Sequence, residues 1–252
     1  MIASPDLAHV HALRDTVRPL SIPVGLVDLA GDLALPPGAR GIVVFVHGSG
    51  SSRHSPRNQF VAHELHQAGL ATLLFDLLTP AEEEHDRFTG ELRFNIGFLA
   101  DRLGDVTEQV RRHPETRHLP IGYFGASTGA AATLVAGAER PAEVAAIVSR
   151  GGRPDLAGGA LEKVVAPTLL IVGGEDHRVL DLNEQAFLRL RCTKRLEIVP
   201  GRHICSRSRG RSVQWRAWRP RGSGTSSPGR SRLTSIPARR LRILRRRKCH
   251  DA

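Results

Sequence analysis

The sequence contains one serine in a setting that could make it a nucleophile. Ser127 stands in Gly125-Ala126-Ser127-Thr128-Gly129, after a short apolar run and before an Ala-rich segment. The run predicts a buried strand, and the segment after it predicts a helix packed against a sheet. A G-x-S-x-G at such a sharp turn lifts the hydroxyl toward free N–H groups at the helix start. Since so short a pattern also occurs by chance, the assignment of Ser127 as a nucleophile depends on whether the sequence also offers an acid, a base and oxyanion donors.

A serine hydroxyl needs a base in contact with it and an acid that orients this base. Asp176 ends a later predicted strand and is the candidate acid, with Glu175 beside it as the alternative. Asp176 could instead only stabilise the start of a helix through the helix dipole. The base should follow the acid in the chain, and His203 is the candidate after the last predicted strand.

Two backbone N–H groups are expected to stabilise the oxyanion that forms when a serine attacks an acyl carbon. The candidates are the N–H of Thr128, directly after the nucleophile, and the N–H of Ser49 in the turn His47-Gly48-Ser49-Gly50. His47 itself precedes the other candidates in the chain and is interpreted as structural. Arg150 and Arg153 follow another predicted strand and are weaker candidates for substrate binding.

The elements that must position these residues alternate along the chain. A hairpin is predicted over residues 16–36, with strands at Val17 to Leu26 and Val27 to Leu35 and with Ala30-Gly31-Asp32 and Pro36-Pro37-Gly38 as turn signals. Glu82 to Asp86 is predicted to be a solvated loop. Further strands are predicted at 42–46, 70–78, 119–124, 144–148, 167–172 and 195–199, and helices at 58–69, 93–112, 128–138, 155–165 and 180–191. This alternation predicts an α/β fold with a mostly parallel sheet, helices on both faces and the active groups at the carboxyl ends of the strands.

The net charge is unevenly distributed. The chain carries a formal charge of +11, but 16 of its 36 Lys and Arg residues lie from Gly201 onward, where Asp251 is the only acidic residue. The preceding residues are mildly acidic in balance. We therefore expect one domain over residues 1–200 and an Arg-rich, disordered tail over residues 201–252. Such a tail predicts only non-specific, salt-dependent binding to nucleic acid or other polyanions.

Composition also excludes several classes of protein. The three cysteines are odd in number and lack metal-type spacing, which argues against a disulfide framework or a zinc site. The first residues lack the basic start and apolar core of a signal peptide, and no apolar run is long enough to span a bilayer. These features predict a cytoplasmic protein that uses no metal and does not enter a membrane.

Five segments together resemble the α/β-hydrolases and, within that fold, the dienelactone-hydrolase-like branch. They are VFVHGSGSSRHSPRN (Val44–Asn58), LLFDLLTPAEE (Leu73–Glu83), IGYFGASTGAA (Ile121–Ala131), VSRGGRPDLAG (Val148–Gly158) and PTLLIVGGEDHRVLDLN (Pro167–Asn183). The resemblance implies hydrolysis of an ester, lactone or similar acyl bond of a small molecule, without metal or organic cofactor. In the family's namesakes a cysteine holds the place of Ser127, whereas many esterase-like relatives have serine there.

The sequence after Gly201 departs from the family pattern. A closing helix is expected behind the base, but Arg, Ser, Gly and Pro follow there without helical period. Suitable codons read in a shifted frame from Arg202 give Ala-His-Leu-Phe-Glu-Glu-Pro-Gly, which resembles the family at this point. We therefore expect that residues 201–252 are frameshifted and that the final helix is missing or replaced by a disordered basic tail. Three alternatives for the function follow: the chain is a weakly active hydrolase, a catalytically inactive pseudoenzyme, or a protein that binds polyanions through its basic tail.

Overall fold

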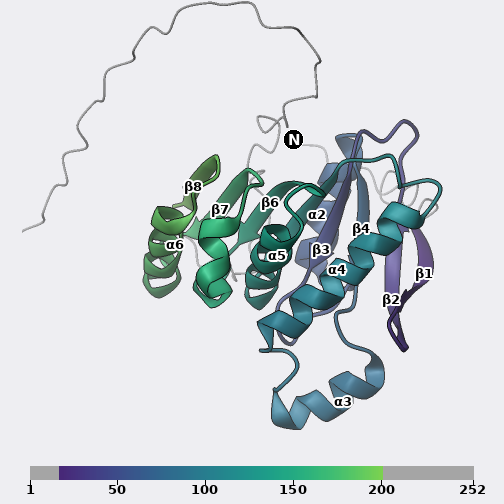
Figure 1. The fold of residues 1–252 in the computed structure, drawn as a ribbon, viewed down its shortest axis with the longest axis horizontal. Coiled ribbons are helices and arrows are strands. Elements are labelled where there is room, and N and C mark those ends of the chain that lie inside the picture. The colour runs from purple at the N-terminus through teal and green to yellow at the C-terminus, as the bar shows by residue number, and fades with distance from the viewer. Residues whose placement is uncertain (1–16, 201–252) are drawn as a thin grey trace, which may run out of the picture. The chain divides into compact units, whose positions relative to one another are not determined.

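The computed structural model describes residues 17–200, which form an eight-stranded sheet flanked by helices (Figure 1). The sheet order is β1-β2-β4-β3-β5-β6-β7-β8. The strands are β1 (Val17–Val24), β2 (Val27–Ala34), β3 (Ile42–Val46), β4 (Ala71–Phe75), β5 (Ile121–Ala126), β6 (Val144–Arg150), β7 (Thr168–Gly173) and β8 (Lys194–Val199). From β3 to β8 all pairings are parallel, whereas β1 and β2 join the sheet antiparallel. The predicted α/β architecture is confirmed.

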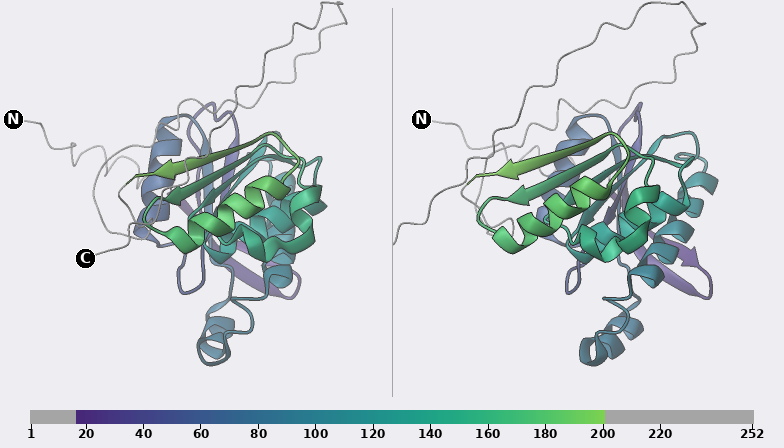
Figure 2. Two further views of the ribbon diagram at one scale, coloured as in Figure 1. Left: turned by 90° about the vertical axis from the view of Figure 1, so that its left-hand side faces the viewer. Right: turned by 60° about the vertical axis from the view of Figure 1, so that its left-hand side comes forward.

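Helices cover both faces of this sheet (Figures 1 and 2). They are α2 (Pro56–Gln67), α3 (Pro80–Thr89), α4 (Ile96–Arg112), α5 (Thr128–Glu139), α6 (His177–Arg189) and the 3₁₀ helix η1 (Pro154–Lys163). On one face, Val61 and Ala62 of α2 pack with Phe45, Leu74 and Phe124 of the central strands. On the other face, α4, α5, η1 and α6 enclose the larger apolar core. None of the helices within residues 17–200 is both long enough and apolar enough to cross a bilayer.

The chain reverses its direction of travel across the sheet between β3 and β5. From β3 it steps outward to β4, and it then returns to place β5 on the other side of β3. In open parallel sheets, ligands bind at such a switch point, outside the carboxyl ends of the strands. Val46 at the end of β3 pairs with Gly125 near the end of β5, so the loops that follow the two strands start side by side.

Two details of the predicted elements are wrong. The acidic segment Glu82 to Asp86 lies in helix α3 rather than in a loop, because Thr79 and Glu82 form a capping box that starts the helix. The two predicted hairpin strands are confirmed as β1 and β2, and the turn between them contains Gly25, whose φ is +56°. The predicted turn signal Ala30-Gly31-Asp32 is wrong, because these residues lie inside β2. Gly31 packs closely against β1, since a Cβ on Gly31 would lie 2.8 Å from Cδ1 of Ile22. A larger residue at this position would require the Ile22 side chain to shift.

Several predictions fall outside the described residues. These are the assignment of His203, the disordered basic tail, the absent closing helix and the frameshift.

Candidate active site

Ser127 occupies the turn between β5 and α5. Its φ of 51° makes it the only non-glycine residue with positive φ among residues 17–200, and its ψ is −124°. A non-glycine residue persists in this conformation only where its surroundings impose it. The turn exposes Ser127, although the residues on both sides of it are buried. The hydroxyl is therefore presented to solvent at the N-terminus of a helix.

Glycines allow this turn to pack against its neighbours. A Cβ on Gly125 would lie 2.5 Å from Cα of Ala130, and one on Gly129 would lie 2.4 Å from the carbonyl oxygens of Val46 and His47. Both glycines of the G-x-S-x-G pattern are therefore required sterically. Gly48 meets the same turn from the β3 side, since its Cβ would lie 2.7 Å from Cβ of Ser127.

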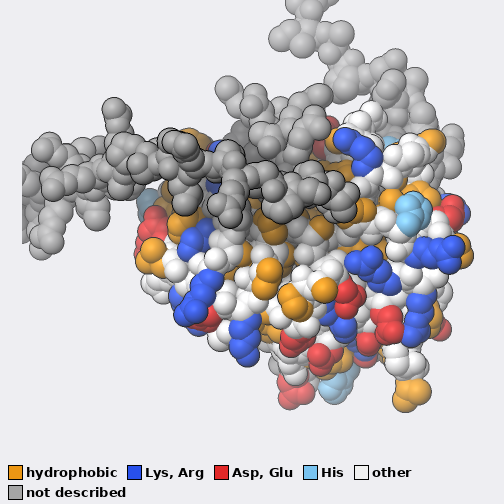
Figure 3. All heavy atoms as spheres, turned by 45° about the horizontal axis from the view of Figure 1, so that its top comes forward, with side chains coloured by type: hydrophobic (Ala, Val, Ile, Leu, Met, Phe, Trp, Pro, Cys, Tyr) orange, Lys and Arg blue, Asp and Glu red, His pale blue; other side chains and the backbone are white. Residues whose placement is uncertain are grey.

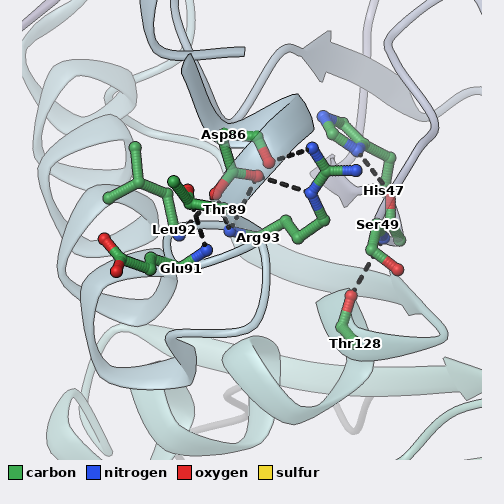
Figure 4. Close-up of polar contacts among 9 residues, drawn as sticks. His47, Ser49, Asp86, Thr89, Glu91, Leu92, Arg93 and Thr128 are labelled. Carbon is green, nitrogen blue, oxygen red and sulfur yellow. Dashed lines mark hydrogen bonds and ion pairs between the residues drawn. The ribbon is translucent and has the colours of Figure 1, made fainter. Parts of the chain in front are cut away.

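The loop after β3 is hydrogen-bonded to the first residue of α5. The N–H of Ser49 donates to Oγ1 of Thr128 at 3.0 Å, as Figure 4 shows. The two residues predicted to supply oxyanion donors thus lie next to each other and next to Ser127. The first N–H groups of a helix have no acceptor within the helix, so the N–H of Thr128 has no intrahelical partner.

His47 has a structural role in this loop. Its Nε2 accepts a hydrogen bond from the N–H of Leu77 at 3.0 Å, and its Nδ1 lies 2.9 Å from the carbonyl oxygen of Gly48. This pairing assigns the proton to Nδ1 and leaves the ring neutral. Burial lowers the pKa of His47 below its ordinary 6.5, although the Gly48 carbonyl and nearby carboxylates raise it in part. His47 therefore joins the loop after β3 to the loop after β4.

Asp176 lies at the same edge of the sheet as Ser127. It is the N-cap of α6, directly after β7, and its Oδ1 accepts from the N–H of Val179 at 3.4 Å. Strands β5 and β7 are separated only by β6, and neighbouring strands lie about 4.8 Å apart, so the two strand ends are about 10 Å apart. The carboxylate and the hydroxyl therefore start from positions between which an imidazole could fit.

Arg150 and Arg153 both have partners within the protein. The guanidinium of Arg150 donates to Oδ1 of Asn58 at 3.1 Å and lies over the ring of Phe124. Arg153 binds Asp155 through two hydrogen bonds of 2.9 and 2.7 Å, which raise the pKa of the guanidinium. A role for either arginine in substrate binding stays a prediction.

A cavity of about 40 Å³ borders the Ser49–Thr128 contact. Its far wall comes from α3 and the segment before α4, and includes Asp86 and Arg93. Asp86 is fully buried; its carboxylate accepts from Nε of Arg93 at 2.5 Å and from the N–H of Leu92 at 2.6 Å (Figure 4). Burial alone would raise the pKa of Asp86, but these hydrogen bonds lower it below its ordinary value.

Two ion pairs near this cavity were missed by sequence reasoning. One is the Asp86–Arg93 pair, which lay partly in a segment predicted to be a solvated loop. The other joins Arg53 to Asp76, where both the backbone N–H and the guanidinium of Arg53 bind the carboxylate. Asp76 lies near the carboxyl end of the strand predicted over residues 70–78, and this position was the available signal.

Within residues 17–200, no group of three or more His, Cys, Asp or Glu side chains could hold a metal ion. On the face in Figure 3, basic and acidic side chains are interspersed.

Known proteins resemble this chain in sequence and in structure. A dienelactone hydrolase from Anabaena variabilis is 57% identical, with a TM-score of 0.73, and the match covers 75% of this chain and 88% of that hydrolase. Est1E from Butyrivibrio proteoclasticus is 15% identical, with a TM-score of 0.63 over 74% of this chain and 90% of its own, and shares the fold alone. A dienelactone-hydrolase-like phosphotriesterase from metagenomic libraries likewise shares the fold, at 17% identity and a TM-score of 0.61 over 74% and 82% of the two chains.

Two curated proteins of Mycobacterium tuberculosis, each named provisionally as a phosphoribosyl transferase, are 56% identical to this chain over 196 residues. The match covers 78% of this chain but 43% of each relative, so the chain spans less than half of their length. No protein-family model matches the chain.

The sheet order, the strained serine turn and these structural relatives define an α/β-hydrolase fold. Within that fold, the chain belongs to the dienelactone hydrolase family.

Proposed function

We propose that this chain is a serine hydrolase that cleaves an ester, lactone or related acyl bond in a small molecule. Ser127 is the nucleophile, Asp176 orients the base, and the N–H groups of Ser49 and Thr128 bind the oxyanion. The base is His203, which lies outside the described residues. The observation that carries the proposal is the φ of 51° at Ser127, a strained conformation at an exposed strand-to-helix turn.

The reaction follows from these positions. Oγ of Ser127 attacks the acyl carbon while the base takes its proton, and negative charge develops on the former carbonyl oxygen. The donors at the start of α5 and in the loop after β3 stabilise that charge. When the tetrahedral intermediate collapses, the base returns the proton to the leaving oxygen and an acyl-serine remains. Water then attacks the acyl-serine by the same sequence, releases the acid and restores the Ser127 hydroxyl.

Hydrolysis of p-nitrophenyl acetate and of a small lactone tests this proposal. The full chain is compared with Ser127→Ala, Asp176→Asn and His203→Gln. We expect Ser127→Ala to reduce kcat/KM by about 10³-fold or more, because loss of a triad nucleophile has effects of this size. Equal rates for the full chain and Ser127→Ala would refute the proposal. A parallel chain that carries the shifted reading frame after Gly201 shows whether the C-terminal residues limit the rate.

The basic C-terminal residues support a second proposal, binding to polyanions. Residues 201–252 contain 16 Lys and Arg residues. We infer that this segment binds nucleic acid without sequence preference and that its affinity falls steeply with salt. Truncation after Gly201 tests whether the two activities are separate. If binding is lost while labelling of Ser127 by an acylating probe persists, the polyanion binding is independent of the hydrolase.

A further inference from the structure

The loop between β6 and η1 connects the turn that carries Ser127 to the strand β7, which leads to Asp176. The N–H of Arg153 donates to the carbonyl oxygen of Ser127 at 3.0 Å, and the N–H of Gly151 donates to Ile171 in β7 at 2.7 Å. Between them, Gly152 packs so closely on the first turn of α5 that a Cβ would lie 2.5 Å from Cβ of Ala130. Residues 151–153 therefore contact both the nucleophile turn and the strand that leads to Asp176.

Asn183 attaches α6 to this loop. Its side chain is fully buried, and its Nδ2 donates to the carbonyl oxygen of Gly152 at 3.0 Å and to that of Val179 at 2.7 Å. The bond to Val179 is local to the helix, whereas the bond to Gly152 joins two separate elements. A buried amide that donates to a loop carbonyl fixes the distance between helix and loop, because either group unpaired would cost free energy.

The same helix carries Asp176. Asp176 is the N-cap of α6, and Asn183 follows it by about two helical turns, so both project from similar sides of the helix. A displacement of α6 at Asn183 would therefore move the carboxylate of Asp176 relative to Ser127. Misplacement of a reacting group by about 1 Å can reduce a rate about 10²-fold.

We propose that Asn183 is a positioning residue, which sets the distance between the acid Asp176 and the nucleophile Ser127 through its hydrogen bond to Gly152. The inference rests on the proposed function of the Ser127–Asp176 pair. It adds a residue that meets no substrate and acts only by holding α6 against residues 151–153.

The variants are chosen to separate this role from general stability. Asn183→Leu keeps the number and branching of the side-chain heavy atoms but removes both N–H donors of the amide. Asn183→Ser keeps a donor that can reach Val179 within the helix but not Gly152. Thr107→Val is the matched control, because Thr107 is also fully buried and its hydroxyl bonds Leu103 in α4 and Tyr123 in β5 rather than any of residues 151–153.

Hydrogen exchange tests the structural link whether or not the chain is active. In Asn183→Leu and Asn183→Ser, we expect exchange of the Arg153 N–H, and of the Leu180 N–H that donates to the carbonyl oxygen of Asp176 at 2.8 Å, to accelerate by 10-fold or more. In Thr107→Val these groups should exchange as in the unmodified chain. Unchanged exchange at Arg153 in both Asn183 variants would overturn the inference.

A double-mutant cycle with Asp176→Asn tests the catalytic consequence. Alone, Asn183→Leu should reduce kcat for p-nitrophenyl acetate about 10- to 100-fold and change KM less than 3-fold. In the Asp176→Asn background it should change kcat less than 3-fold, since its effect acts through Asp176. Equal effects in both backgrounds would overturn the positioning role. If the unmodified chain and Ser127→Ala show the same rate, the proposed function fails instead, and the exchange measurement still decides the link.

Discussion

Ser49 donates its backbone N–H to the hydroxyl of Thr128 at 3.0 Å, across the boundary between the loop after β3 and the helix after β5. The two segments are far apart in sequence, and each contributes one predicted oxyanion donor. The bond holds the loop beside the nucleophile turn.

Thr128→Val should lower kcat for p-nitrophenyl acetate about 10-fold, because the loop that carries Ser49 loses the hydrogen bond that orients it. This is less than the 10²- to 10³-fold loss that follows removal of a complete oxyanion donor, since the backbone N–H remains. Thr128→Ser keeps the hydroxyl and should retain most of the activity. If the two variants have the same kcat, the Ser49–Thr128 bond does not organise the site.

Gly129→Ala should destabilise the fold by about 3 kcal/mol or more, because the added Cβ would lie 2.4 Å from two backbone oxygens that side-chain rotation cannot move. Gly159→Ala is the matched control, since nothing lies within 4 Å of the Cβ it would add. Urea unfolding followed by far-ultraviolet circular dichroism measures both. Equal midpoints would contradict the packing described for the turn.

His47 should make the stability of the fold decrease as the pH falls. Burial lowers its pKa in the folded protein below the ordinary 6.5, so the unfolded chain binds a proton there more tightly. Its stabilising contribution is complete above about pH 6.5 and is lost at up to about 1.4 kcal/mol per pH unit below that.

Urea titrations at pH 8, 6.5 and 5 measure this contribution. The advantage of the unmodified chain over His47→Gln should be largest at pH 8 and shrink toward pH 5. His54→Gln, which changes an exposed residue, should follow the unmodified chain at every pH. An advantage of the same size at all three pH values would show that His47 does not titrate as described.

Arg93→Met should cost about 1–3 kcal/mol of stability, since it leaves the fully buried Asp86 carboxylate without its charged partner. Arg87→Met removes an exposed ion pair with Glu84 within α3, the helix that also carries Asp86. It should change stability by less than about 0.5 kcal/mol. Urea unfolding compares the two variants. An Arg93→Met protein as stable as Arg87→Met would mean that the buried pair contributes nothing.

The nucleophile turn and the order of strands and helices could be predicted because each depends on local signals. Apolar runs identify the buried strands, and glycines that flank Ser127 identify the turn. The helix α3 could not be predicted from its apolar pattern, because the capping box at Thr79 and an ion pair between Glu82 and Arg102 stabilise it instead. The link from Asn183 to Gly152 was also hidden, since it joins residues 31 positions apart that only the folded sheet brings together.

A fluorophosphonate probe followed by peptide mass spectrometry tests the central claim most directly. The probe phosphonylates a serine only where a base activates it and donors bind the oxyanion. We predict a single modification at Ser127 in the full chain, at a rate that Asp176→Asn reduces and Ser127→Ala abolishes. The account would be contradicted if the full chain were not modified at Ser127 and if the chain with the shifted reading frame after Gly201 were modified at a serine other than Ser127.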